Sequence, residues 1–295
     1  MYTPLERINL ALRRVLPGCV TLSQAVAFNM FLAFFPMLLF GLGIVTSSDM
    51  WKGSVHELPE RVRNILPPGS ERIIFDYFTR RAIHPFRWMW LGFAGMLLAG
   101  TQVMLGLIQG FRVVERSSDW VSHWRLNLRA LILLSITIVP WTVFVLVTVF
   151  ARSWRTWIVA RLGFPMTVRL IFAVAYHGLA LTLALVVLLV IYRLGQPGIK
   201  SWASAVPGAA VATLLWWIVD LGFGTYMRFF PYTVVYGGLA DAIGLLLWMY
   251  LTAIVLFMGA AYNAVCLEED ALEGMPRHVL FAEAQPVTAR MTRET

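Results

Sequence analysis

Three ionisable side chains, His177, Asp220 and Asp241, lie inside long apolar stretches of the sequence, where they could handle ions or protons. A charge at the centre of a bilayer costs about 2.5 to 3.5 kcal/mol on insertion scales, so such groups usually face a cavity or a partner. We expect Asp220 and Asp241 to border one outward-opening polar cavity and to bind a cation, proton or hydroxide, with His177 deeper. The alternative is that each side chain extends to the nearby interface.

Amides and glycines in the apolar stretches are a second group of candidates. Asn29, Gln102 and Asn263 could line a substrate or ion pathway, or could bond a neighbouring helix. Small residues let helices approach closely in a membrane, so Gly106, Gly110 and Gly259 are expected to serve helix packing. Gly106 and Gly110 could also pair two chains, which leaves a homo-oligomer open. On the last apolar stretch, a stripe at helical spacing should face the bundle, namely Asp241, Gly244, Trp248, Thr252, Val255, Gly259 and Asn263.

No pattern in the sequence is typical of a catalytic or metal site. The five histidines form no HxxxH or HxH pair, no Asp-x-Asp occurs, and Cys19 and Cys266 are too far apart for a CxxC site. A GxSxG elbow, a phosphate loop and a strand for stacking RNA bases are also missing. We therefore expect no catalytic residue, metal, cofactor or nucleic-acid partner, and no enzymatic activity.

The elements that position these residues are six long uncharged or nearly uncharged stretches. Hydrophobic residues make up 59% of the 295 positions and charged residues only 14%, with a mean hydropathy of +0.72. About 20 helical residues cross the hydrocarbon core, and only helices pair every backbone group within such a segment. The sequence predicts an all-α protein with a six-transmembrane-helix bundle, its spans at 22–45, 88–111, 130–151, 170–192, 202–226 and 238–267.

The segments outside the spans are each expected to have their own structure. Residues 1–21 predict a separate amphipathic helix in the headgroup plane, begun by the capping box at Thr3 to Glu6 and ended by Pro17-Gly18. The insertion 49–87 within the membrane domain 22–267 predicts two short amphipathic helices. Between the later spans, 112–129 and 152–169 are short links with interfacial arginine and tryptophan. The tail 268–295 is expected to be largely disordered after Gly274.

Charge does not choose the orientation of the chain. With a cytoplasmic N-terminus, the inside and the outside segments each hold twelve lysines and arginines. The net charge of +8, spread over both faces, suits anionic lipid headgroups rather than nucleic acid. Cys19 and Cys266 fall at the same side of the membrane, and free thiols fit a cytoplasmic face best.

The C-terminal third carries a distinctive set of residues, with a related run at 25–36 upstream. They are Pro207-Gly208-Ala209, Trp216, Phe223, Tyr226, Tyr232, Tyr236-Gly237-Gly238-Leu239, Leu247 to Leu251, Gly259-Ala260 and Asn263-Ala264. This set resembles the signature of the YihY/BrkB family of bacterial inner-membrane proteins. The resemblance implies six helices, cytoplasmic termini and residence in a bacterial inner membrane. Where the family commonly has Gly-Ala-Glu this chain has Gly259-Ala260-Ala261, and where the family has Tyr-Asn it has Tyr232-Thr233.

Two classes of function follow from these observations. A transporter or permease for a lipid, a small amphiphile or an osmolyte fits the ionisable groups in the spans and the proline and glycine near helix ends. The alternative is a non-transporting envelope or scaffold protein. Family members have carried the label ribonuclease BN, but the residues described above do not favour a nuclease.

The predicted topology can be tested by labelling with an impermeant thiol reagent. Both termini should be cytoplasmic and the insertion 49–87 outside, because an even number of spans returns the chain to its starting side. A cysteine introduced at Ser54 should therefore react in intact cells, and one at Ser201 only after lysis. Reaction at position 201 but not at 54 would reverse the assignment.

Overall fold

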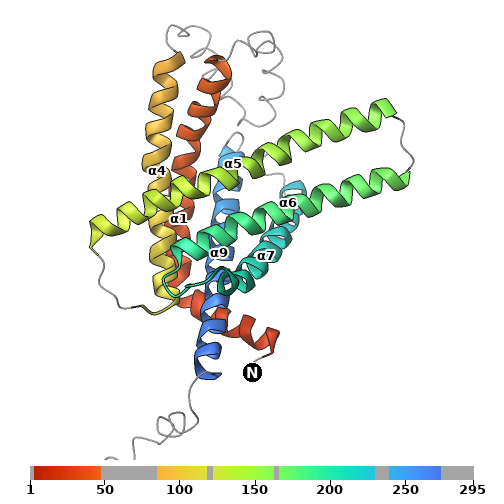
Figure 1. Ribbon diagram of the computed structural model, residues 1–295. Coiled ribbons are helices and arrows are strands. Elements are labelled where there is room, and N and C mark those ends of the chain that lie inside the picture. Colours follow the sequence, from red (N-terminus) through yellow and green to blue (C-terminus); the bar gives the residue numbers. More distant parts are fainter. Residues whose placement is uncertain (1–2, 48–84, 118–121, 163–165, 230–238, 274–295) are drawn as a thin grey trace, which may run out of the picture.

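The computed structural model describes residues 3–47, 85–117, 122–162, 166–229 and 239–273. Figure 1 shows that these residues form long helices. The described helices are α1 (Pro4–Ser47), α4 (Pro85–Val114), α5 (His123–Leu162), α6 (Met166–Gly195), α7 (Trp202–Phe229) and α9 (Leu239–Glu273). The predicted helices of the insertion 49–87 fall almost entirely outside the described residues.

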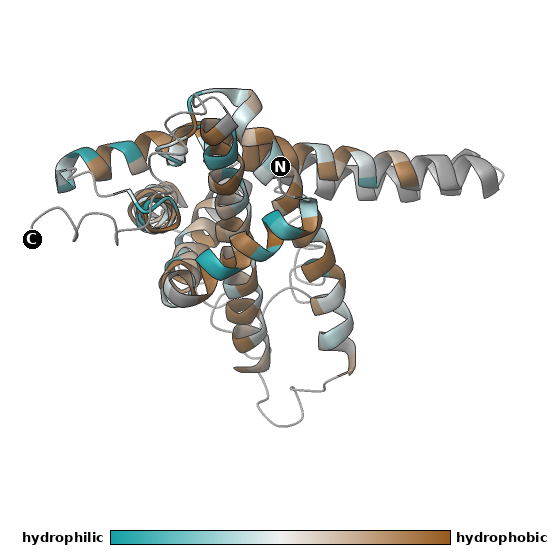
Figure 2. Cartoon of the chain, turned by 90° about the horizontal axis from the view of Figure 1, so that it is seen from below, coloured by the Kyte–Doolittle hydropathy of each residue, from teal (hydrophilic) through white to brown (hydrophobic). Residues whose placement is uncertain are grey.

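Six of the described helical segments are long and apolar enough to cross a membrane, which confirms the predicted all-α, polytopic fold. They are Gly18–Gly41, Met89–Val114, His123–Val143, His177–Gly195, Trp202–Met227 and Ala242–Leu272. Hydrophobic residues cover much of each helix in Figure 2, while hydrophilic residues gather in a few turns. Large side chains such as Leu98 and Phe35 are exposed, as expected where the solvent is lipid.

Helices α1, α4 and α9 pack together into the centre of the molecule, and α7 packs against α9. Phe111 of α4, Tyr192 of α6 and Phe257 of α9 meet edge to face and are fully buried. The antiparallel pair α5 and α6 packs against α4 and α7, with Tyr192 of α6 bonded directly to α9, and runs across this centre at a steep angle (Figure 1). The bundle is therefore a tight α1–α4–α9 core with an α5–α6 hairpin laid against it.

Helix α1 begins as the sequence predicts but does not stop where it predicts. The Thr3 N–H donates to Glu6 Oε2 (2.7 Å) and the Glu6 N–H donates to Thr3 Oγ1 (3.3 Å), which confirms the capping box. Pro17 and Gly18 lie inside one continuous helix of 44 residues, so the prediction of a separate helix ended by this pair is wrong. A proline within a helix removes one backbone bond, and the turns on either side of it are long enough to propagate without that bond.

The start of α1 lies beside the end of α9. Arg7 Nε pairs with Glu269 Oε2 at 2.9 Å, and Arg14 pairs with Glu268. Residues 268–273 of the predicted tail belong to α9, which ends immediately before Gly274, where the sequence predicts that any helix stops. Residues 274–295, for which disorder is predicted, lie outside the described part. The predicted apolar face of this first segment (Leu5, Ile8, Leu12 and Leu16) is exposed. Both described ends of the chain therefore sit at one end of the bundle (Figure 1).

The segment 152–169, predicted as a short interfacial link, is mostly helical. Helix α5 continues through Arg152 to Leu162, and α6 begins again at Met166. Residues 152–162 contain neither glycine nor proline, so nothing in them ends a helix, and the described part of α5 stops just before Gly163 and Pro165, residue types that commonly follow a helix end.

The three glycines singled out for packing lie at helix contacts within the chain. A Cβ at Gly106 would meet Val26 Cγ2 at 2.8 Å, and a Cβ at Gly110 would overlap the ring of Phe257. At Gly259 it would overlap the Tyr192 hydroxyl, the Gly208 carbonyl oxygen (2.6 Å) and the Ala212 Cβ (2.7 Å). The described contacts of Gly106, Gly110 and Gly259 thus join α1, α4, α6, α7 and α9 inside one bundle.

Replacing Gly259 by leucine should destabilise the protein by about 3 kcal/mol, because the new side chain has no space between α7 and α9. The same change at Ala210, an exposed position of α7, should alter stability by less than about 0.5 kcal/mol. Thermal unfolding in detergent, followed by the monodisperse fraction, measures both. Equal tolerance at the two positions would reject this packing.

Candidate functional site

A buried polar cluster holds α6, α7 and α9 together near one end of the bundle. The Tyr192 hydroxyl donates to the Leu256 carbonyl (2.8 Å), and Gln196 Nε2 donates to the Ala260 carbonyl (3.0 Å). Asn263 Nδ2 donates to Gln196 Oε1 at 3.4 Å. Buried polar groups stabilise a bundle when they are paired in this way. The cluster therefore ties the end of α6 to the middle of α9.

Asn263 also joins α7 to α9. Its Oδ1 accepts the Gly208 N–H at 2.6 Å, and the asparagine is fully buried. A Cβ at Gly208 would overlap the Gly259 carbonyl oxygen, so only glycine permits this approach. The polar atoms of Asn263 are thus used in helix packing, the second of the two roles that the sequence left open for it.

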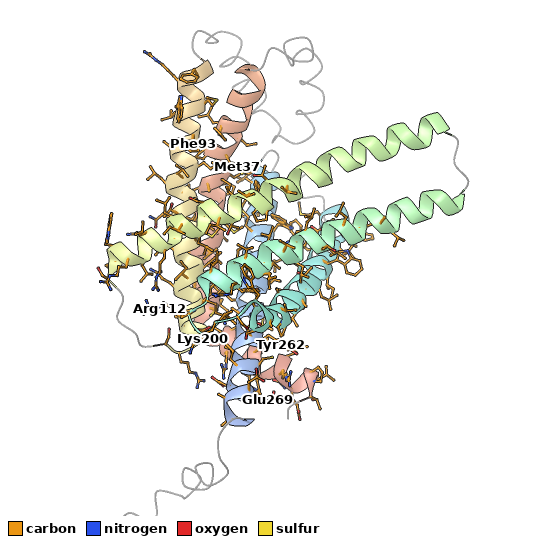
Figure 3. The ribbon with its side chains drawn as sticks, viewed as in Figure 1. Met37, Phe93, Arg112, Lys200, Tyr262 and Glu269 are labelled. Atoms are coloured by element: carbon orange, nitrogen blue, oxygen red, sulfur yellow. The ribbon has the colours of Figure 1, made fainter. Side chains whose placement is uncertain are left out.

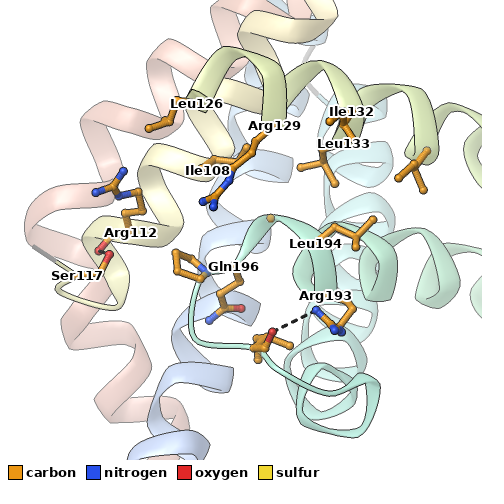
Figure 4. Close-up of a pocket in the computed structure, with 14 residues that line it drawn as sticks. Ile108, Arg112, Ser117, Leu126, Arg129, Ile132, Leu133, Arg193, Leu194 and Gln196 are labelled. Atoms are coloured by element: carbon orange, nitrogen blue, oxygen red, sulfur yellow. Dashed lines mark hydrogen bonds between the residues drawn. The ribbon is translucent and has the colours of Figure 1, made fainter. Parts of the chain in front are cut away.

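A cavity of about 390 Å³ lies beside this cluster, between α4, α5, α6 and the α6–α7 link. Its polar lining comes from four different segments of the chain, and the apolar lining mainly from α5 (Figure 4). The polar lining residues are Arg112, Ser117, Arg129, Arg193 and Gln196. The apolar ones include Ile108, Leu126, Ile132, Leu133, Ile136 and Leu194.

Two turns of the backbone shape this cavity. After α4, Arg116 adopts a left-handed conformation (φ 52°), and the Ser117 N–H donates back to the Arg112 carbonyl at 3.0 Å. After α6, the Gln196 N–H still donates to the Tyr192 carbonyl (3.0 Å), while Pro197 cannot extend the helix. Glu115 Oε2 accepts the Gly198 N–H at 2.9 Å and so joins the two turns.

The electrostatic character of the cavity is basic. Arg193 Nη1 donates to the Ile199 carbonyl at 3.3 Å, and its guanidinium lies 5.9 Å from the ring centre of Trp202. Arg129 is exposed and points into the cavity from α5 in Figure 4. The described lining contains no carboxylate. Glu115, in the turn after α4, accepts the Gly198 N–H instead, and burial raises its pKa. The site is therefore suited to a negatively charged group.

The cavity lies at the end of the bundle that holds both described chain ends. Figure 3 places Arg112, Lys200, Tyr262 and Glu269 toward this end, and Met37 and Phe93 toward the other. With the orientation expected from the sequence, this end is cytoplasmic.

The ionisable residues singled out in the sequence lie elsewhere. Asp220 is exposed on α7, about 27 Å of helix rise beyond Trp202, and His177 is exposed on α6. Asp241 lies in the first turn of α9, and its side chain is outside the described part. None of the three lines the described cavity, so the outer cavity stays a prediction.

The two remaining amides are also apart from the cavity. Asn29 is half-buried on α1, and Gln102 is exposed on α4. Sequence reasoning interpreted Arg112 and Arg129 as interfacial anchors and did not single out Arg193. The available signal was that all three arginines stand at ends of spans expected on one face.

Comparison with known proteins agrees with the resemblance seen in the sequence. The model of the family described as virulence factor BrkB matches residues 16–278. A UPF0761 membrane protein of Janthinobacterium is 25% identical over 81% of this chain and 54% of its own length. A UPF0761 membrane protein of Laribacter hongkongensis is 25% identical over 83% of this chain and 57% of its own length. Another, from Pseudoalteromonas translucida, is 34% identical over 32% of this chain and 31% of its own length.

The relatives from Janthinobacterium and Laribacter match most of this chain, but the chain spans little more than half of their length. No solved structure matches it. The family match covers most of the chain, including all six apolar helices and the cavity between α4, α5 and α6. The chain therefore belongs to the BrkB family, whose relatives named here are UPF0761 membrane proteins.

Proposed function

We propose that this protein is a transporter of the bacterial inner membrane, with its described chain ends in the cytoplasm, and that it carries a small molecule or a lipid. The observation that supports this best is the position of the arginine-lined cavity. It lies where the α5–α6 hairpin meets the α1–α4–α9 core, inside a six-helix membrane domain.

A cavity at the boundary of two packed units can change its access when one unit moves against the other. Glycine contacts lock α1, α4 and α9 together, so the core would move as one body. The α5–α6 hairpin contacts α4 and α7, and the end of α6 is bonded to α9 through Tyr192 and Gln196. Motion of the hairpin that pivots on this bonded end of α6 would open or close the cavity and leave the α1–α4–α9 contacts intact.

The second part of the proposal concerns the far half of the membrane. Asp220 is exposed within a span, where a carboxylate needs water, a cation or a proton. Asp241 begins the neighbouring helix α9. These two carboxylates are proposed to bind the coupling cation or proton, and no enzymatic step is required.

Proteoliposomes test the proposal with two probes. Dithionite bleaching follows the movement of a fluorescent NBD-labelled phosphatidylglycerol between leaflets, and trapped pyranine follows protons. The wild-type protein should raise the rate of at least one movement above that of protein-free vesicles. The double variant Asp220→Asn, Asp241→Asn should lower that rate by at least about tenfold, because the asparagine amides cannot exchange a proton at neutral pH.

The matched control is Asp270→Asn, at an exposed aspartate beyond the apolar core of α9. It should leave the rate unchanged. Wild-type protein without any flux would overturn the transporter proposal in favour of a non-transporting envelope or scaffold protein. Unchanged flux in the well-inserted Asp220→Asn, Asp241→Asn double variant would assign the carboxylates to the interface.

A further inference from the structure

The cavity between α4, α5 and α6 has two chemically different ends. In Figure 4, Gln196 and Arg193 lie along the lower side of the cavity, and Ile132 and Leu133 of α5 lie along the upper side. Leu194 extends the apolar side. A ligand that fills such a cavity must itself have a polar and an apolar part.

Two arginines from different helices border the polar part. Arg129 points inward from α5, and Arg193 lines the lower side at the end of α6, where it also bonds the Ile199 carbonyl (Figure 4). The Nε of Arg193 is buried and makes no hydrogen bond to any described residue. A guanidinium presents its N–H groups as a planar fork that fits phosphate and carboxylate oxygens. An oxyanion would satisfy the buried donor that the protein leaves without a partner.

The apolar part is open at the side of the bundle. Ile132 is 50% exposed, Ile136 45% and Leu194 44%. Ile132 and Ile136 lie within the span His123–Val143, and Leu194 within His177–Gly195. Side chains exposed at this depth face acyl chains rather than water. The cavity is thus reached from the membrane as well as from the end of the bundle.

We propose that this cavity binds an amphiphile with an anionic phosphate or carboxylate head, held by Arg129 and Arg193, while its acyl chain lies along Ile132, Ile136 and Leu194. The ligand enters sideways from the leaflet next to the described chain ends. This inference deepens the proposed transport function, because it names the substrate class, but binding can be measured without transport.

The experiment uses the full chain in detergent and microscale thermophoresis. The probes are dihexanoylphosphatidylglycerol, dihexanoylphosphatidylcholine and inorganic phosphate. Phosphatidylglycerol should bind at least about tenfold more tightly than either other probe, since it alone offers a net anionic head and a tail. Arg129→Gln should weaken its binding by at least about tenfold, equivalent to about 1.4 kcal/mol.

Arg125→Gln is the matched control, because Arg125 is an exposed arginine one turn earlier on α5 and does not line the cavity. It should leave the Kd within about twofold of wild type. Ile136→Trp, a change at an exposed position, should weaken the binding of phosphatidylglycerol but not the binding of phosphate, since the indole ring fills only the apolar end of the cavity. This second variant keeps the test valid if Arg129→Gln lowers the yield.

Three results would overturn the inference. They are an unchanged Kd in both Arg129→Gln and Ile136→Trp, equal binding of the two phospholipids, and binding of inorganic phosphate as tight as that of phosphatidylglycerol. The last result would indicate a site for a free anion. If binding is as expected but proteoliposomes show no flux, the binding site stands and the transport function is rejected. If proteoliposomes show flux but the variants bind phosphatidylglycerol as wild type does, the transport function stands and the binding site is rejected.

Discussion

The close approach of α7 and α9 at Gly208 and Gly259 is the contact on which the rest of the bundle depends. Here backbone meets backbone, since a Cβ on either glycine would overlap a carbonyl oxygen of the other helix. In lipid there is little hydrophobic drive between helices, so close packing and interhelical hydrogen bonds must supply the stability. Asn263 provides such a bond at this crossing by accepting the Gly208 N–H.

The same crossing determines where the cavity lies. Gln196 bonds to the Ala260 carbonyl and Asn263 bonds to Gln196, so the end of α6 is held at a defined height on α9. Arg193, one turn earlier on α6, is thereby brought to the level of the turn after α4. The packing contact and the candidate binding site are therefore parts of one arrangement.

Charge serves two different purposes at this end of the protein. Arg7 and Arg14 are neutralised by Glu269 and Glu268, so they join α1 to α9. Arg129 and Arg193 line a cavity instead, and its described lining contains no carboxylate. Counting positive charges on the two faces could not separate these roles, because the count ignores which carboxylates lie nearby.

The sequence by itself determined the number and the kind of the membrane spans, because a span is read from about 20 consecutive apolar residues and needs no partner. It also determined the cap at Thr3 and Glu6, which is a contact over three residues. It did not determine that α1 continues through Pro17, since a proline can either end a helix or lie inside one. Only the tertiary structure decided that Arg112, Arg129 and Arg193 share a cavity and that Asn263 is used for packing. These residues lie on different helices, and the crossing of those helices depends on side-chain shapes that no local pattern encodes.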